Sequence, residues 1–333
     1  MVNRSFNPLA IGAAGVLVVL VAAISLWRPW QDTSSVAQTP VDERPTAETR
    51  GNDVFADAKS GTCLNWPAGD PHAYAVVHCS DEHRFEVADS VDLSAFPGSE
   101  YGPDAPPPSQ DRIQKISQEL CQAAARQYLG AKYDPNGRFS VIMLWSGDLA
   151  WRQDGERHVL CGLHLAAPDG GAMPIIGKVA ELDQSKVWPP GTCVTIGSNG
   201  DFPIDCAQPH TMEVTGSVDL ASQFPLALPS DADQDEFVKT SCLLLTDAYL
   251  TPLELRETTL TLIYSTVSQP SWDAGSKRVA CSIGAPRDDG EWSFIRNNAK
   301  GQLLIDGEPP SGTKDVPATR SESPPIPPPE PTP

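Results

Sequence analysis

The sequence predicts an α+β fold. We expect two tandem small disulfide-stapled domains, each with one helix packed on a small, mostly antiparallel sheet, after an N-terminal transmembrane helix. Three observations predict this fold: an internal repeat, a cysteine pattern that occurs twice, and a helical segment followed by short β-prone segments in each copy. The chain has 333 residues, 40% of them hydrophobic, which leaves room for about two domains with packed cores.

The internal repeat is visible in short motifs. GTC at Gly61–Cys63 returns at Gly191–Cys193, and VVHCSDEHRFEV, ending at Val87, returns as PIDCAQPHTMEV, ending at Val214. SVDL then follows in both copies. A tryptophan and a basic residue precede the fourth cysteine of each copy, namely Trp151 with Arg157 and Trp272 with Lys277. We therefore expect a tandem duplication, with copies at 56–182 and 187–304.

Each copy contains four cysteines, and their order is the same in both: Cys63, Cys79, Cys121 and Cys161, then Cys193, Cys206, Cys242 and Cys281. Eight cysteines outside a membrane span indicate disulfides in an oxidising compartment. Zinc is the alternative, but no two of these cysteines form the close pair that is usual in structural zinc sites. Three pairings per copy are open. The short first interval favours first with second, and third with fourth.

One helix per copy is predicted around the third cysteine. Pro108–Asp111 offers a helix cap, and Gly130 can end the first helix. The second helix has a cap near Asp231 or Asp233, and Pro252 closes it. Short β-prone segments follow in each copy, at Phe139–Leu144 and Val159–His164, then at Thr258–Tyr264 and Arg278–Ile283. A disulfide between helix and later strand would hold the helix on the sheet.

The N-terminus predicts membrane attachment. Residues 9–27 contain no charged residue and are long enough for a transmembrane helix, with Trp27 and Trp30 at its outer edge. We expect residues 1–8 in the cytoplasm and the bulk of the chain outside, as in a single-pass protein of the cell membrane. A cleaved signal peptide is the alternative. Residues 28–55 are predicted to be a flexible linker, and 305–333 a proline-rich disordered tail.

The motifs together resemble the septum-formation domain of actinobacteria. The resemblance rests on G-x-C, then V-x-C-x₃-H-x₂-E-V, a helix with a cysteine, and W-x₃-G-x-R-x₃-C. The first copy matches every element, whereas the second has Lys277 at the basic position and Trp272 shifted by one residue. The resemblance implies a membrane-attached, extracytoplasmic protein connected with septum or envelope processes. It brings no catalytic residues.

The histidine and glutamate of this motif need separate consideration. They are His83 and Glu86 in the first copy and His210 and Glu213 in the second. At the start of a strand, residues three apart lie on opposite faces, which argues against a metal site. We expect each histidine to form a hydrogen bond with the turn beside the disulfide, so these residues, like the tryptophan–basic pairs, are predicted to be structural. No metal and no cofactor are expected.

The remaining features narrow the function. A formal charge of −19 disfavours nucleic acid and anionic lipid headgroups as partners. No phosphate-binding loop, G-x-S-x-G elbow or free thiolate is apparent, so we do not expect an enzyme. We expect a non-enzymatic binding component of the envelope, with an envelope or division protein as partner. A ligand-binding or sensory ectodomain for a cell-wall or lipid molecule is the alternative, and a metal-dependent hydrolase is a more distant one. The sequence does not predict the oligomeric state.

Overall fold

The computed structural model describes residues 54–70, 72–197, 200–310 and 319–320. The predicted membrane span at 9–27, the linker up to residue 53 and most of the proline-rich tail lie outside these residues. In the described part of the chain, no helix combines the length and the apolar character that crossing a membrane requires. We refer to residues 54–182 as the first half and to residues 187–310 together with 319–320 as the second half.

The first half contains a six-stranded sheet, with antiparallel pairing throughout. Its strands are β1 (Cys63–Asn65), β2 (Ala75–Val77), β3 (Phe85–Asp92), β4 (Phe139–Trp145), β5 (His158–Ala166) and β6 (Ala172–Met173). Five of them have the order β2-β1-β3-β5-β4, and β6 pairs with the end of β5. The short interval from Cys63 to Cys79 therefore contains the two neighbouring strands β1 and β2.

The second half contains a sheet with the same strand order. Its strands are β7 (Cys193–Gly197), β8 (Gly200–Ile204), β9 (Met212–Asp219), β10 (Thr261–Tyr264), β11 (Arg278–Gly284) and β14 (Thr319–Arg320). The order β8-β7-β9-β11-β10 repeats that of the first sheet, and β14 adds a parallel strand beyond β10. A separate two-stranded sheet joins β12 (Ile295–Arg296) to β13 (Leu304–Ile305).

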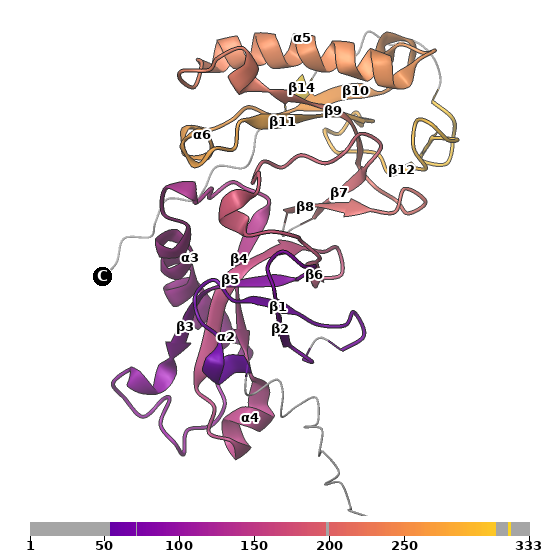
Figure 1. Cartoon of the computed structure of the whole chain (residues 1–333). Helices are drawn as coiled ribbons and strands as arrows, with labels where there is room; N and C mark the ends of the chain where they lie inside the picture. Colours follow the sequence, from indigo (N-terminus) through magenta and orange to yellow (C-terminus); the bar gives the residue numbers. More distant parts are fainter. Residues whose placement is uncertain (1–53, 71, 198–199, 311–318, 321–333) are drawn as a thin grey trace, which may run out of the picture. The chain divides into compact units, whose positions relative to one another are not determined.

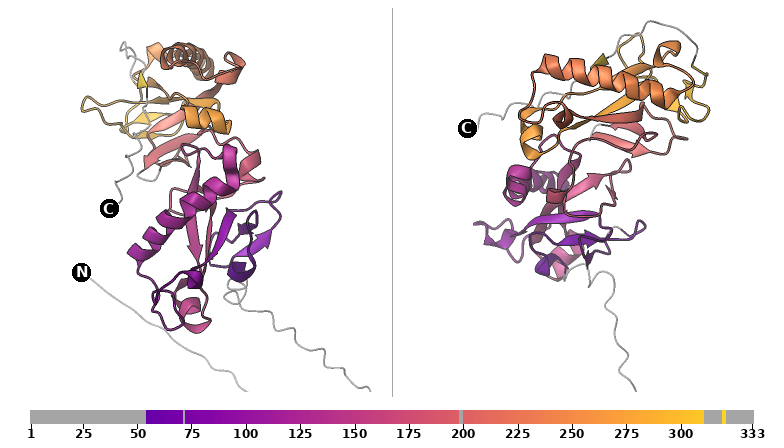
Figure 2. Two further views of the ribbon diagram at one scale, coloured as in Figure 1. Left: turned by 90° about the vertical axis from the view of Figure 1, so that its left-hand side faces the viewer. Right: turned by 45° about the horizontal axis from the view of Figure 1, so that its top comes forward.

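One main helical segment packs against each sheet (Figure 1). In the second half it is α5 (Asp231–Leu250), which begins after the N-cap Ser230 and contacts β9, β10 and β11. Its buried residues recur every four positions, as a helix face requires: Gln234, Val238, Cys242, Thr246 and Leu250. Figure 2 shows α5 lying along one face of its sheet.

The corresponding segment of the first half is less regular. It begins with α2 (Gln110–Ile116) after the N-cap Ser109, passes through a π-helical turn at 117–121, and continues as α3 (Gln122–Leu129). Gly130 ends it with a backbone φ of 53°. The π-helical turn ends at Cys121, and this cysteine is its one buried residue.

Two further short helices make the expectation of one helix per copy incomplete. They are α4 (Gly147–Gln153) in the first half and α6 (Gln269–Ala274) in the second half. Helix α4 lies between β4 and β5, and α6 lies between β10 and β11. Six or seven residues are too few for a recognisable helical period.

Four disulfides staple the two halves internally: Cys63–Cys79, Cys121–Cys161, Cys193–Cys206 and Cys242–Cys281. These are the pairings that the cysteine spacing favoured. No free cysteine is found among the described residues. In each half the longer bridge joins the main helix to the central strand β5 or β11 and closes an interval of about 40 residues. Loop-entropy models assign roughly 4 kcal/mol of stabilisation to such a closure.

Candidate functional site: a pocket in the first half and a buried histidine–glutamate motif

A basic side chain lies over a tryptophan ring in each half. The guanidinium carbon of Arg157 is 3.9 Å from the centroid of Trp151, and Nζ of Lys277 is 4.4 Å from the centroid of Trp272. The tryptophans lie on α4 and α6, and the basic residues immediately precede β5 and β11. The structure therefore brings together both pairs that the sequence repeat singled out. A cation over an indole face is attracted by the negative potential of the ring.

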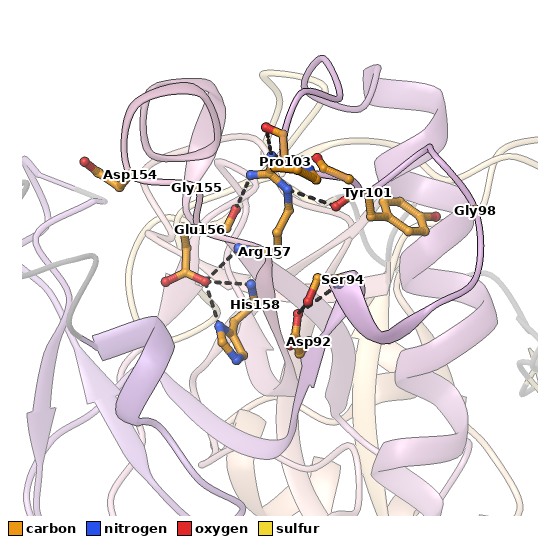
Figure 3. A pocket seen from close by; sticks show the side chains of 11 residues that line it. Asp92, Ser94, Gly98, Tyr101, Pro103, Asp154, Gly155, Glu156, Arg157 and His158 are labelled. Carbon is orange, nitrogen blue, oxygen red and sulfur yellow. Dashed lines mark hydrogen bonds and ion pairs between the residues drawn. The ribbon is translucent and has the colours of Figure 1, made fainter.

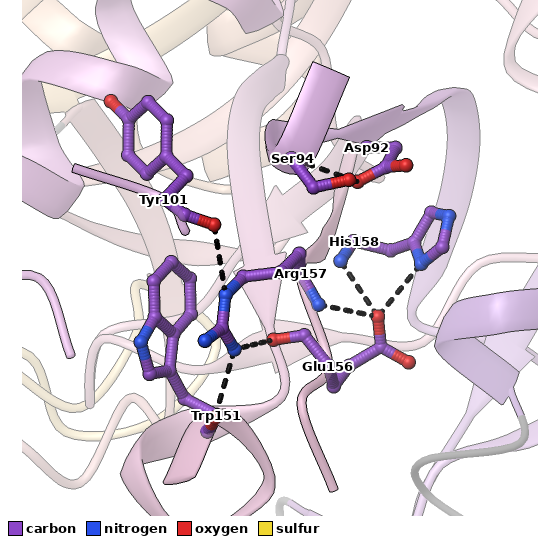
Figure 4. Close-up of polar contacts among 7 residues, drawn as sticks. All are labelled: Asp92, Ser94, Tyr101, Trp151, Glu156, Arg157 and His158. Carbon is purple, nitrogen blue, oxygen red and sulfur yellow. Dashed lines mark hydrogen bonds and ion pairs between the residues drawn. The ribbon is translucent and has the colours of Figure 1, made fainter. Parts of the chain in front are cut away.

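Arg157 also fixes a loop, which Lys277 does not. Its guanidinium donates hydrogen bonds to the carbonyl oxygens of Trp151, Glu156 and Tyr101 (Figure 4). It also donates to the carbonyl oxygens of Gly102 and Pro103, so three consecutive carbonyls are held. Arg157 is only 6% exposed. A guanidinium carries five donors in a fixed planar arrangement, whereas an ammonium group has three, so the arginine can hold several carbonyls at once.

This loop and the end of α4 enclose a cavity of about 440 Å³ (Figure 3). Its walls are the end of β3, the loop that Arg157 holds, and the turn that leads into β5. The lining residues are Asp92, Ser94, Gly98, Tyr101, Gly102, Pro103, Asp154, Gly155, Glu156, Arg157 and His158. We call this cavity the loop pocket. Its volume lies within the range of small-molecule sites.

Two carboxylates of the loop pocket are held in defined positions. Oε1 of Glu156 accepts the backbone N–H groups of Arg157 and His158 at 2.8 and 2.7 Å, and it lies 2.7 Å from Nδ1 of His158. Asp92 accepts hydrogen bonds from the N–H and the hydroxyl of Ser94 at 2.9 and 2.6 Å. The Ser94 hydroxyl lowers the pKa of Asp92, so this carboxylate is ionised at neutral pH.

The same contacts bear on catalysis. Because a carboxylate only accepts hydrogen bonds when ionised, Nδ1 of His158 carries the proton that faces Glu156. A histidine oriented by a carboxylate could serve as a base, but the Ser94 hydroxyl bonds to Asp92. Among the described residues no hydrogen bond joins Ser94 to His158, so a serine nucleophile activated by histidine is not assembled. The arrangement is suited to binding.

The second half has the same framework without these polar groups. Counting from the shared SVDL and from the basic residue, Ser94, Glu156 and His158 correspond to Ala221, Ser276 and Arg278. Asp92 corresponds to Asp219, which caps a short turn in the same way by accepting the N–H of Ala221. The polar lining of the loop pocket is therefore not needed to build the fold. This pocket was not predicted from the sequence. A signal was present, because the segment before the main helix, Pro97–Ser109, is longer in the first half than its counterpart in the second.

The histidine–glutamate motif is fully buried in both halves, with His83, Glu86, His210 and Glu213 each 0% exposed. Nδ1 of His83 is 2.9 Å from the carbonyl oxygen of Asp81, and Nδ1 of His210 is 2.9 Å from that of Gln208. Each histidine thus bonds to the turn that follows the second cysteine of its half, as the sequence suggested.

The prediction that His83 and Glu86 lie on opposite faces is wrong. One ligand atom of each lies within 4.8 Å of the other, and Cys63 Sγ belongs to the same group. The alternation of a strand does not apply because β3 begins only at Phe85. His83 precedes it in an isolated bridge with Ile175. Residues outside a regular strand are not bound to its two-residue period.

Each motif glutamate connects a strand to a helix and to a later segment. Glu86 accepts the Tyr128 hydroxyl at 2.6 Å and the N–H of Val179 at 2.8 Å. Glu213 accepts the Tyr249 hydroxyl at 2.5 Å and the N–H of Ala299 at 2.8 Å. Burial raises the pKa of both tyrosines, and the neighbouring glutamate adds to the effect.

The two tyrosines are not part of the motifs that the sequence analysis singled out. A sequence signal for their role exists, because each lies seven residues after the third cysteine of its copy. Seven residues are two helical turns, so the tyrosine faces the sheet together with the cysteine. Burial also raises the pKa of Glu213 and lowers that of His210, which indicates that the charged form of either residue is disfavoured in this interior.

Comparison with known proteins places this α+β, disulfide-stapled chain in a family. A family model described as septum formation matches residues 60–281. The chain belongs to the septum-formation family, as its motifs suggested, and a single match runs through both halves. No solved structure matches.

Two relatives from Mycobacterium tuberculosis are 54% identical to the chain over 330 residues, which covers 98% of this chain and 73% of each relative. Their names are "Uncharacterized membrane protein Rv3835", from strain ATCC 25618 / H37Rv, and "Uncharacterized membrane protein MT3943", from strain CDC 1551 / Oshkosh. The relatives are thus named as membrane proteins, which agrees with the membrane association that the N-terminal sequence indicates.

Proposed function

We propose that this protein is a membrane-anchored, extracytoplasmic and non-enzymatic binding component of the cell envelope that takes part in septum formation. In this proposal residues 9–27 anchor the chain, residues 28–55 are a spacer, and the two halves are duplicated units of one fold. Family membership, the names of the relatives and the four disulfides support it. The identical order of five strands in the two sheets supports the duplication.

The loop pocket is the observation that carries the binding role. Ser94, Glu156 and His158 line it, and the second half forms the same strand order with Ala221, Ser276 and Arg278 in their place. Polar groups that a fold does not need, gathered in a cavity on a rigid disulfide-linked framework, are typical of a contact site. The second half then serves mainly as framework, and the first half makes the contact.

The test combines localisation with a change of the pocket. A fluorescent fusion at the N-terminus should concentrate at division sites, and depletion should alter cell length or septum placement. The variant Ser94→Ala/Glu156→Ser/His158→Arg, which copies the second half, should fail to restore normal division although it folds and reaches the membrane. The reciprocal change Ser276→Glu/Arg278→His is the matched control and should restore it. An even membrane distribution with normal cell shape on depletion would contradict the proposal.

A second candidate function is a ligand-binding or sensory ectodomain for a cell-wall or lipid molecule. The volume and polar lining of the loop pocket favour it. Soluble cell-wall fragments and short-chain lipids would be screened for an increase in the melting temperature of the wild type. The increase should be absent in the triple pocket variant. A ligand that stabilises the wild type and this variant equally would bind elsewhere.

A further inference from the structure

His83 has a buried ring nitrogen without a hydrogen-bond partner. Its Nδ1 lies 2.9 Å from the carbonyl oxygen of Asp81, which can only accept, so Nδ1 carries a proton. The Nε2 atom of the neutral ring then carries no proton and has a free lone pair. No described residue donates to it, and the side chain is 0% exposed. A polar atom left unpaired in an interior is unfavourable and calls for an explanation.

The surroundings of this lone pair have the composition of a metal site. Cys63 Sγ, one ring nitrogen of His83 and one carboxylate oxygen of Glu86 all lie within 4.8 Å of one another, and all three residues are buried. Thiolate sulfur, imidazole nitrogen and carboxylate oxygen are the three kinds of ligand that zinc takes in proteins. Three potential ligands, Cys63, His83 and Glu86, thus lie close together before any metal binds.

The supporting contacts are also those of a metal site. Ligating histidines almost always donate their second ring N–H to a carbonyl or carboxylate, as Nδ1 of His83 does to Asp81. Ligating carboxylates are themselves held by hydrogen bonds, as Glu86 is by Tyr128 and Val179. Both ligands are therefore fixed in orientation by groups that would remain in place on metal binding.

The disulfide keeps this site closed, because Cys63 is bonded to Cys79 and offers no thiolate. A dithiol can open it. One thiolate of the dithiol attacks Cys79 Sγ, the S–S bond breaks, and its electron pair leaves on Cys63 Sγ. The second thiol of the dithiol then displaces Cys79, so the dithiol is oxidised to a disulfide and both cysteines are reduced. Attack at Cys79 is the accessible route, because Cys79 is partly exposed and Cys63 is 1% exposed.

We propose that Cys63, His83 and Glu86 form a latent zinc site that fills when the Cys63–Cys79 disulfide is open. The Cys63 thiolate and the Glu86 carboxylate each carry one negative charge and together neutralise Zn²⁺. The filled site therefore buries no net charge. The domain would then have two stapled states, one held by the disulfide and one by the metal.

The second half is an internal comparison. His210 repeats the Nδ1 contact to a carbonyl, and its Nε2 is likewise buried without a partner. In the described residues, however, the compact three-ligand group is found only around Cys63. We therefore expect the group of Cys193, His210 and Glu213 to bind metal more weakly.

The direct test uses the full chain purified in detergent and the variant Cys79→Ser, which frees the Cys63 thiol while three disulfides remain. Co²⁺ alone is the probe, followed by displacement with Zn²⁺. The variant should bind one Co²⁺ with the absorption of a tetrahedral thiolate complex. Adding His83→Ala or Glu86→Gln to it should weaken binding by at least about tenfold to a hundredfold. Adding His72→Ala, at an exposed position, should leave binding unchanged.

The matched control is Cys63→Ser, which leaves the Cys79 thiol free instead and should bind Co²⁺ at least about tenfold more weakly. Equal binding by Cys79→Ser and Cys63→Ser, or binding that survives His83→Ala, would overturn the proposal. Circular dichroism establishes that each variant is folded. If Cys79→Ser does not fold, the wild type is reduced with a dithiol and alkylated with and without Zn²⁺. Zinc should then protect the Cys63 thiol in the wild type and not in His83→Ala, and equal labelling of both would overturn the proposal.

Discussion

Between the first long strand and the main helix, the first half has a segment of irregular chain at 96–109, whereas the second half has only 223–230 at the same place. The longer segment lines the loop pocket and accepts hydrogen bonds from Arg157. The shorter segment belongs to the half in which Lys277 replaces this arginine over the tryptophan ring. The order of five strands, the disulfide pattern and the buried glutamate–tyrosine hydrogen bonds are shared by the two halves. The framework is therefore separable from the site that one half adds to it.

The cores differ as well. In the second half most of the buried apolar residues form one continuous cluster, from Val218 to Leu303. In the first half they fall into four smaller clusters, one around Phe85, one around Phe139, one around Trp151 and one around the Cys121–Cys161 bridge. A divided core has less cooperative packing, so the first half should depend more on its covalent links.

The largest expected effect comes from removing the longer disulfide. Replacing Cys121 and Cys161 together by alanine should lower the free energy of unfolding by about 2–5 kcal/mol. Replacing Cys242 and Cys281 opens a nearly equal interval, since the separations are 40 and 39 residues. The loss should be larger in the first half because its core is divided. Urea denaturation of the two double variants measures this, and a larger loss in the second half would contradict our reading of the cores.

The next effect concerns acid. His164 on β5 is buried, and burial lowers its pKa from 6.5 to about 4. Its folded pKa lies below its unfolded one, so its contribution to stability is present above pH 6.5 and is lost as the pH falls toward 4. The loss can reach about 3 kcal/mol. His164→Gln should therefore reduce the acid sensitivity of the wild type between pH 6.5 and 4, measured by urea denaturation across this range.

The position of His164 is taken by Gly284 in the second half, counting three residues from the fourth cysteine. The contribution of His164 therefore has no counterpart at the equivalent position of the second half. His72→Gln, at an exposed position, is the matched control and should leave the pH dependence unchanged. A His164→Gln variant with the same pH dependence as the wild type would show that this histidine ionises normally.

Much of this framework was predictable from the sequence. Helices around Cys121 and Cys242, the strands at 139–144, 159–164 and 278–283, and the disulfide pairing follow from spacing and from local periodicity. The strand predicted at Thr258–Tyr264 is shorter, because Thr258 caps the preceding 3₁₀ turn and β10 begins only at Thr261. Local patterns suffice where a residue's neighbours are close in sequence.

The loop pocket and the ligand group around Cys63 were not predictable in this way. Asp92 and His158 are brought together only because β3 pairs with β5, with Asp92 opposite His158 in the register. The nearness of His83 to Glu86 depends on the bridge from His83 to Ile175, far along the chain. Both sites arise from long-range pairing, which composition and periodicity do not encode.

A smaller effect is expected from exchanging the two basic residues. Arg157→Lys keeps a cation near Trp151 but cannot hold the carbonyls of Tyr101, Gly102 and Pro103 together. Leaving such acceptors unpaired should cost about 1–3 kcal/mol and should make the segment 97–108 more susceptible to limited proteolysis. Lys277→Arg, where no such loop exists, should change stability by less than about 0.5 kcal/mol. Similar effects of the two exchanges would show that the loop does not depend on Arg157.

The smallest expected effect is the pH dependence of stability that Glu213 causes in the second half. Its sign is opposite to that of His164. Burial raises the pKa of Glu213, so its folded pKa lies above its unfolded value of about 4.5. Its favourable contribution is present below the unfolded pKa and is lost as the pH rises through the folded one. The wild type should therefore lose more stability than Glu213→Gln between pH 5 and pH 7, whatever the absolute cost of the substitution. Urea denaturation at the two pH values measures this difference, with the exposed Glu291→Gln as control.

If Glu213→Gln loses as much stability as the wild type over this interval, the buried carboxylate is ionised without penalty. The hydrogen bonds from Tyr249 and Ala299 would then outweigh the desolvation.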